Sequence, residues 1–263
     1  MTADFVEMFR EQYTYRELLW QMTRRDLLLR YKQTVMGVGW ALFMPLANTA
    51  VFSIIFTRVA TIETGVPYPI FAYTGLIAWN FFASALRVAV VSLTSNSQLV
   101  TKVYFPREAF PLSAVVVSFT DFAVSSIVLI GMLIYYEIPL TGAVLMVPVI
   151  LMPHAMLTAG CAMLLAMGNL FFRDVKYIFE VVIVLGMFGT SVLYPTEKFG
   201  GDLSAVAALN PLTILINAYR DVLLFGRMPD LVPFMAATLF SAVVLLGAWL
   251  IFHRAEFKFA ENI

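Results

Sequence analysis

Long, uninterrupted apolar runs limit what this chain can fold into more than any other feature of its sequence. Six such runs can be read, at about residues 35–56, 70–93, 112–136, 143–170, 178–194 and 231–252. Each is close to or above the roughly 20 apolar residues that a helix needs to cross a bilayer core about 30 Å thick. A transmembrane sheet would show alternating segments of about ten residues instead. The sequence therefore predicts an all-α integral membrane protein with six transmembrane helices.

Composition excludes several other classes of protein. Hydrophobic residues make up 61% of the chain and charged residues 13%, whereas a soluble domain has roughly 45–50% and about 25%. This argues against a soluble enzyme domain, a disordered regulator and a disulfide scaffold. Lys plus Arg equals Asp plus Glu, at 17 each, so no nucleic-acid partner is expected. The single cysteine, Cys161, lies in an apolar run and is interpreted as a packing residue.

The basic residues are distributed unevenly between the two sides of the predicted bundle. Twelve of the 17 lysines and arginines fall on one side, four fall on the other, and Arg87 lies inside a run. Such an excess marks the cytoplasmic side, so both termini are expected there. The chain then divides into a cytoplasmic segment (1–34), a membrane domain (35–253) and a cytoplasmic tail (254–263). The first segment has no signal-peptide core, so the first run is expected to direct insertion.

Residues 13–32 form a separate element before the first run. Apolar side chains are mixed there with acidic and basic ones, and Pro and Gly are absent, so a helix is predicted. The segment is too polar to span a bilayer. We expect an amphipathic helix in the cytoplasmic interface, with its basic side chains near anionic lipid headgroups. It can serve as a plain anchor, as a docking surface for a cytoplasmic partner, or as both.

The loop between the second and third runs, residues 94–111, places apolar side chains beside charges. Val100, Val103 and Phe105 lie among lysine, arginine and glutamate residues. Exposed apolar side chains in a loop favour a contact with another protein. Packing against the floor of the bundle is the alternative.

The outer segment between the last two runs, residues 195–230, is half apolar. Two stretches, 203–209 and 212–225, favour helices, and Pro211 suits the first helical position of the second. Neither stretch is long enough to span a bilayer. We therefore expect short re-entrant helices on the outer side, at about 203–226.

Ionisable side chains in apolar surroundings are costly unless protein or water surrounds them. Arg220 and Asp221 are therefore expected to face protein or a cavity. Arg87 and Asp121 lie at comparable depth on successive runs, so we expect them to pair or to join one polar network. His154 is interpreted as a helix-to-helix hydrogen bond rather than a proton relay. An ion-coupled transporter is expected to have several acidic or histidine residues within the membrane, and one Asp and one His are few for that purpose.

No motif for catalysis or for energy supply is found in the chain. None of the 14 glycines precedes a lysine, so no G-x-x-x-x-G-K-[ST] phosphate loop exists. Two histidines and one cysteine form no zinc-type motif, and no G-x-S-x-G elbow is found. We expect no catalytic residue, cofactor or metal on this chain, and an energy source on a separate subunit.

Four strings, in order along the chain, resemble a known family. They are RDLLLRYKQTVMGVGWALFMPL (25–46), KVYFPREAFPLS (102–113), GNLFFRDVKYIFE (168–180) and LNPLTILINAYRDVLLFG (209–226). The family is that of the type-2 ABC exporter permeases. The chain most resembles the branch that exports lipid-linked polysaccharides, namely O-antigen, capsule and teichoic acid. The four strings identify the permease family more specifically than they distinguish polysaccharide exporters from drug exporters.

The resemblance implies a homodimer in the bacterial inner membrane that binds two copies of an ABC ATP-binding subunit. ATP and Mg would lie on that subunit, and the substrate would be a lipid-linked polysaccharide. The implied contacts with the ATPase subunit are Arg24, Arg25, Asp26, Arg30, Gln98, Lys102, Phe105, Arg107, Glu108, Arg173 and Asp174.

An aromatic face can stack on the apolar face of a sugar ring without fixing its position, which a sliding polymer requires. The implied glycan channel includes Trp40, Phe43 and Tyr194. The implied outer gate includes Asn210, Pro211, Arg220 and Asp221. A permease of a drug or lipid ABC exporter stays open as an alternative, as does an ion-coupled secondary transporter.

Overall fold

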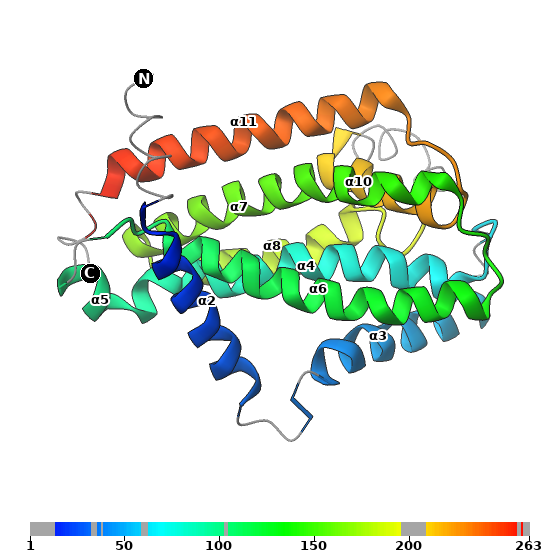
Figure 1. The fold of residues 1–263 in the computed structure, drawn as a ribbon, viewed down its shortest axis with the longest axis horizontal. Coiled ribbons are helices and arrows are strands. Elements are labelled where there is room, and N and C mark those ends of the chain that lie inside the picture. The colour runs from blue at the N-terminus through cyan, green and yellow to red at the C-terminus, as the bar shows by residue number, and fades with distance from the viewer. Residues whose placement is uncertain are drawn as a thin grey trace.

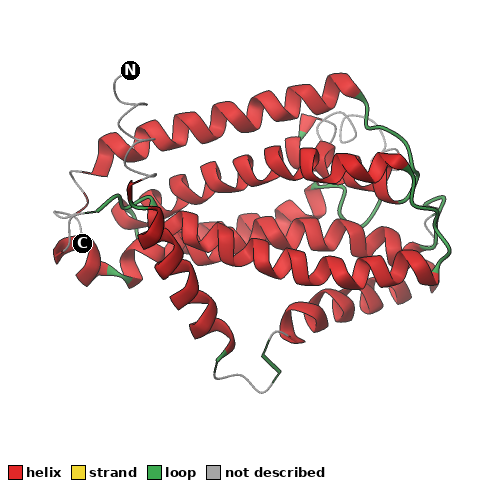
Figure 2. Cartoon of the chain, in the orientation of Figure 1, coloured by secondary structure: helices red, strands yellow, loops and turns green. Residues whose placement is uncertain are grey.

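The computed structural model describes residues 14–32, 36–37, 39–58, 63–102, 105–195, 209–256 and 259. Within these ranges the regular structure is helical and no strand occurs (Figure 1, Figure 2). The elements are α2 (Arg16–Tyr31), α3 (Gly39–Arg58), α4 (Tyr68–Ser95), α5 (Ser97–Lys102), α6 (Ala109–Tyr135), the 3-10 turn η1 (Gly142–Met146), α7 (Val147–Phe171), α8 (Val175–Gly189), α10 (Pro211–Leu223) and α11 (Leu231–Ala255). The prediction of an all-α fold is confirmed.

Five helical segments are long and apolar enough to cross a membrane. They are Gly39–Thr57, Tyr68–Ser95, Ala109–Tyr135, Gly142–Phe171 and Leu231–Ala255. These match the first four predicted runs and the sixth. The fifth run contains α8, which has 15 residues and therefore measures about 22 Å. Because this is less than a bilayer core, the described residues contain five candidate spans, and the sixth predicted span is not confirmed.

The central helix of the bundle is α4, which packs against α3, α6, α7, α8 and α10. Its small residues Ala78, Ala85 and Ala89 are almost fully buried, as expected where helix backbones approach closely in a membrane. Gly75 makes the closest approach, because a Cβ there would lie 2.4 Å from the backbone oxygen of Val192. This position therefore needs glycine for reasons of space.

A second close helix contact joins α7 and α11, which run side by side along the bundle (Figure 1). A Cβ added at Gly160 would lie 2.9 Å from the Val244 side chain and 3.0 Å from the backbone of Leu245. Glycine thus lets the two helices pack closely, and their tight packing anchors the last span to the core.

One end of the bundle gathers segments that are distant in sequence, and we call it the α5 end (Figure 1). Met22 of α2, Val100 of α5, Phe105, Phe252 of α11 and Phe259 belong to one buried cluster there. The exposed fractions of Val100 and Phe105 are 0% and 6%. The expectation that these two side chains form an exposed contact is wrong, because burying them in this apolar cluster is more favourable than leaving them in water.

The predicted N-terminal helix is confirmed as α2. Met22 and Thr23 are buried on its inner face, where the helix packs against α6. Trp20 and Leu29 are exposed on its surface. An exposed apolar surface of this kind suits a helix that lies against lipid.

At the opposite end of the bundle, α10 confirms that the second stretch, 212–225, forms a helix. Asn210 caps it, because its side-chain oxygen accepts a 3.0 Å hydrogen bond from the Leu212 amide, and Pro211 is the first helical residue. The first predicted outer helix, 203–209, lies outside the described residues except for its last residue.

Candidate functional site

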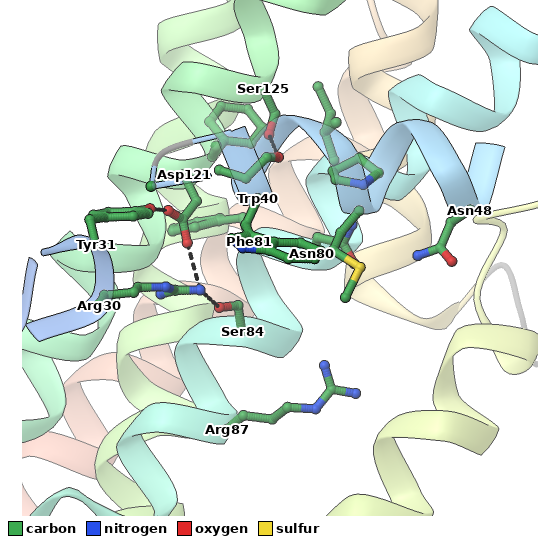
Figure 3. A pocket seen from close by; sticks show the side chains of 16 residues that line it. Arg30, Tyr31, Trp40, Asn48, Asn80, Phe81, Ser84, Arg87, Asp121 and Ser125 are labelled. Atoms are coloured by element: carbon green, nitrogen blue, oxygen red, sulfur yellow. Dashed lines mark hydrogen bonds and ion pairs between the residues drawn. The ribbon is translucent and has the colours of Figure 1, made fainter. Parts of the chain in front are cut away.

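The main polar cavity is lined by residues of α2, α3, α4 and α6 and has a volume of about 440 Å³ (Figure 3). Its lining residues recur at helical spacing, so each span turns one mixed face toward it. They are Arg30 and Tyr31 in α2, Gly37 before α3, Trp40, Ala41, Met44, Pro45 and Asn48 in α3, Ile77, Asn80, Phe81, Ser84 and Arg87 in α4, and Asp121, Phe122 and Ser125 in α6.

An ion pair between α2 and α6 forms the polar centre of the cavity. The Arg30 guanidinium lies 2.8 Å from Asp121 and donates a 3.1 Å hydrogen bond to the Ser84 hydroxyl. The Tyr31 hydroxyl donates to the other Asp121 oxygen. Nη1 of Arg30 has no hydrogen-bond partner within the part of the chain that the structure describes. Arg30 was expected to contact an ATPase subunit, but the structure places its charge in this cavity.

Arg87 also lines the cavity, but its ion-pair partner is Glu180 of α8, at 3.4 Å. Both side chains are about half exposed, so this pair contributes little to stability. Figure 3 shows Arg87 apart from the Arg30–Asp121 pair. The predicted direct pair of Arg87 with Asp121 is therefore wrong, although both side chains line the same polar cavity.

Of the three aromatic residues assigned to a glycan channel, two pack together and only one lines the main cavity. Trp40 lines the cavity. Phe43 packs edge-on against Trp40, with ring centroids 5.7 Å apart, and does not line the cavity itself. Tyr194 lies in the segment after α8, where its backbone oxygen accepts a hydrogen bond from the Ser191 hydroxyl.

At the end of the bundle opposite the α5 end, Arg220 is buried to 3% exposure and faces protein, as expected for a charge among apolar helices. Its guanidinium donates to the backbone oxygens of Ser191 and Val192 and lies 3.7 Å from the centroid of the Phe71 ring. Asp221 pairs instead with Arg227 at 2.7 Å. Arg220 thus ties α10 to α4 and to the chain that follows α8.

The predicted ATPase contacts divide into exposed and buried sets. Exposed or half-buried positions are Arg24, Arg25, Asp26, Gln98, Arg173 and Asp174. Glu108 is buried to 1% exposure, and the Arg107 side chain is only 13% exposed. The side chain of Lys102 lies outside the described residues. Phe105, Arg107 and Glu108 therefore contact other parts of this chain rather than a surface that is open to a partner.

Glu108, His253 and Glu256 form the one group among the described residues whose ligand atoms could hold a metal ion. These atoms lie within 4.8 Å of one another. The Arg107 amide donates a 3.1 Å hydrogen bond to Glu256. The Arg107 guanidinium lies 3.9 Å from the Glu256 carboxylate, so a neighbouring arginine already balances part of the negative charge. Burial and the nearby carboxylate of Glu108 raise the pKa of Glu256 to about 7.

Sequence reasoning missed several polar residues of the main cavity. Tyr31, Asn48, Asn80, Ser84 and Ser125 all line it. A signal was available, because Asn80 and Ser84 lie one turn apart on α4, which is mainly apolar, as do Asp121 and Ser125 on α6. Polar residues with that spacing indicate one shared helix face.

Comparison with known proteins assigns this chain to a family. The family described as "ABC-2 type transporter" matches residues 17–224, which include the cavity and most of the helices. The chain belongs to the ABC-2 type transporter family. This makes it a transport component that spans the membrane several times.

Among relatives of this ABC-2 type transporter is an O-antigen export system permease protein RfbA from Myxococcus xanthus. It is 31% identical over 262 residues, which cover 98% of this chain and 100% of the relative. An O-antigen export system permease protein RfbA from Klebsiella pneumoniae is 29% identical over 248 residues, covering 93% and 94%. The similarity therefore extends over nearly the whole of each chain.

Proposed function

We propose that this chain is the permease subunit of an ATP-driven exporter that moves a lipid-linked polysaccharide across the bacterial inner membrane. The observation that carries the proposal is the near full-length similarity to O-antigen export permeases. Both termini would be cytoplasmic, because twelve of the 17 lysines and arginines lie in the two terminal segments and in the segments that join the second run to the third and the fourth to the fifth.

The chemistry of the main cavity supports a sugar substrate. Trp40 offers an aromatic face, and Asn48, Asn80 and Ser84 offer amide and hydroxyl groups. Such groups can exchange hydrogen bonds with sugar hydroxyls. A drug exporter would favour a more apolar lining, so the cavity favours polysaccharide over the same-class alternative.

An ion-coupled transporter has less support. Asp121 is paired with Arg30, which already balances its charge within the cavity. His154 is fully buried between the rings of Phe81 and Tyr219, with centroids 5.0 Å and 5.9 Å away. No described acid contacts His154, so these residues do not form a relay.

Energy would come from two copies of an ATP-binding subunit, with ATP and Mg bound there. Exposed groups at the α5 end, Arg24, Gln98 and Asp174, supply polar contacts for such a partner. The chain would work as a homodimer. A second copy would cover apolar side chains of α3, such as Val51 and Ile54, which are 55% and 64% exposed.

Two finer features belong to the same proposal. The segment after α8 would complete a sixth crossing of the membrane, because α8 alone is too short. The short α10, with Asn210, Pro211, Arg220 and Asp221, would form a re-entrant element that shapes the outer exit.

The proposal is tested by deleting the gene in a strain that lacks any paralogue. We expect surface polysaccharide to disappear and the polymer to accumulate in the cytoplasm. Complementation with Trp40→Ala should restore only slow export, whereas Trp20→Ala, on the exposed surface of α2, should restore normal export. Both variants should still co-purify with the ATP-binding subunit. Unchanged surface polysaccharide after deletion would refute the proposed function.

A further inference from the structure

A second cavity lies at the α5 end, where α4, α5, α7 and α8 meet. Its volume is about 270 Å³. Arg173 and Lys176 are the charged residues that line it, and no acidic residue does so among the described residues. Thr94, Ser97 and Asn169 add polar groups. The cavity therefore combines two positive charges with neutral hydrogen-bonding groups.

The position of the two cations favours an anion between them. Lys176 is in the first turn of α8, and Arg173 lies just before this 15-residue helix. A helix N-terminus carries a partial positive charge and attracts anions, whereas cations there are unfavourable. Asp174, at the N-cap, makes no capping hydrogen bond. Glu180, one turn further along the helix, pairs with Arg87 instead.

Asn169 supplies a second, independent indication. It is buried to 3% exposure, and its amide nitrogen donates a long 3.5 Å hydrogen bond to the Thr94 hydroxyl. Its side-chain oxygen has no hydrogen-bond partner within the described residues. A buried acceptor of this kind is costly until a donor reaches it. A hydroxyl group next to the anion would meet that need with a small side-chain rotation.

The cavity lies at the ends of two spans, which is the level expected for lipid headgroups. The spans α4 and α7 end beside it, at Ser95 and Phe171. Above it, α8 exposes Ile178, Val181 and Leu185, with exposed fractions of 60% or more. An acyl chain can lie along these side chains while the headgroup reaches the two cations.

We propose that this cavity binds the headgroup of an anionic phospholipid, with its phosphate at Arg173 and Lys176 and a headgroup hydroxyl at Asn169. Phosphatidylglycerol has both groups. The site adjoins α5 and the turn at residues 172–174, so lipid binding would neutralise positive charge beside the surface proposed for ATPase docking. The lipid site itself does not depend on the proposed substrate.

The test uses the complete permease with its ATP-binding subunit in bilayer nanodiscs of phosphatidylcholine with added phosphatidylglycerol. Native mass spectrometry counts the phosphatidylglycerol that stays bound to each permease chain. The variant R173Q/K176Q is compared with R16Q/R254Q, which loses the same charge at the same end without touching the cavity. We expect the first to weaken phosphatidylglycerol retention about tenfold or more, and the second to change it little. R173K/K176R should retain the lipid.

Three outcomes would overturn the proposal. Equal retention by the two double variants would show that the cavity is not the site. Binding of inorganic phosphate by the wild type, without retention of phosphatidylglycerol, would assign the cavity to a free anion. Loss of the ATP-binding subunit from R173Q/K176Q, with phosphatidylglycerol retention unchanged, would assign the cations to an acidic group on that protein.

Discussion

The guanidinium of Arg30, in the last turn of α2, lies 2.8 Å from the carboxylate of Asp121 in α6. This ion pair fastens the N-terminal helix to a membrane span, next to the short connection to α3. The main cavity lies beside the pair, so the position of α2 and the shape of the cavity are linked.

Breaking this pair should loosen α2. We expect Asp121→Asn to lower stability by about 1–2 kcal/mol, between the values for exposed and buried pairs, because Arg30 is partly exposed. Thermal unfolding in detergent, together with protease cleavage near residue 32, measures both effects. Arg30→Met combined with Asp121→Asn should cost less than the sum of the single changes. Strict additivity would mean that the two groups do not interact.

Replacing Arg220 should disrupt the end of the bundle opposite the α5 end. Lysine keeps the charge, but it lacks the planar fork of donors that reaches the oxygens of Ser191 and Val192. We expect Arg220→Lys to destabilise by about 2–3 kcal/mol, since it leaves buried carbonyl groups without donors. Arg227→Lys, on the exposed side of the same end, is the control. Equal thermal midpoints for the two variants would contradict the role given to Arg220.

A methyl group at Gly75 should disturb the contact between Arg220 and Val192. The new Cβ would lie 2.4 Å from the Val192 oxygen and 2.5 Å from the Arg220 guanidinium, so α4 and the segment after α8 must separate. We expect Gly75→Ala to cost about 1–3 kcal/mol, as overpacking usually does. Gly131→Ala, in α6, meets nothing within 4 Å and should be neutral or slightly stabilising. Thermal unfolding of both variants distinguishes a steric effect from a general effect of alanine.

The group of Glu108, His253 and Glu256 should make the stability of the fold depend on pH. The pKa of Glu256 is raised from 4.5 to about 7, first by burial and then by Glu108. Its protonated form is therefore favoured in the folded chain. The stabilisation is complete below about pH 4.5 and is lost as the pH rises through 7.

Glu256→Gln should remove that dependence, because glutamine stays neutral and can still accept the hydrogen bond from the Arg107 amide. At pH 8 we expect the variant to be more stable than the wild type by about 2 kcal/mol. Thermal midpoints measured between pH 5 and pH 8 provide the comparison. Glu63→Gln, at an exposed position, should keep the wild-type profile, and an unchanged profile for Glu256→Gln would rule out the ionisation argument.

Much of the fold could be predicted because its signals are local. A run of about 20 apolar residues is a helix in a bilayer whatever its neighbours are. Pro211 likewise predicts the start of α10 from one residue. The cost of leaving Arg220 in lipid correctly indicated that it faces protein.

The candidate site was less predictable because its contacts join different helices. Asp121 could pair with an arginine from any neighbouring element at the same depth. The rotation and packing of α2 bring Arg30 to it, whereas Arg87 is left facing Glu180. In the same way, the fold of the α5 end buries Val100 and Phe105 beneath segments from both ends of the chain.

The amino-acid sequence alone specified a helical membrane protein, the positions of five spans and the uneven distribution of basic charge, because each follows from hydropathy and charge along the chain. Only the tertiary structure decided which polar side chains share a cavity and where α8 ends. Those features depend on how helices rotate and pack against one another, and close contacts such as that between Gly75 and Val192 set this packing across more than 100 residues of sequence.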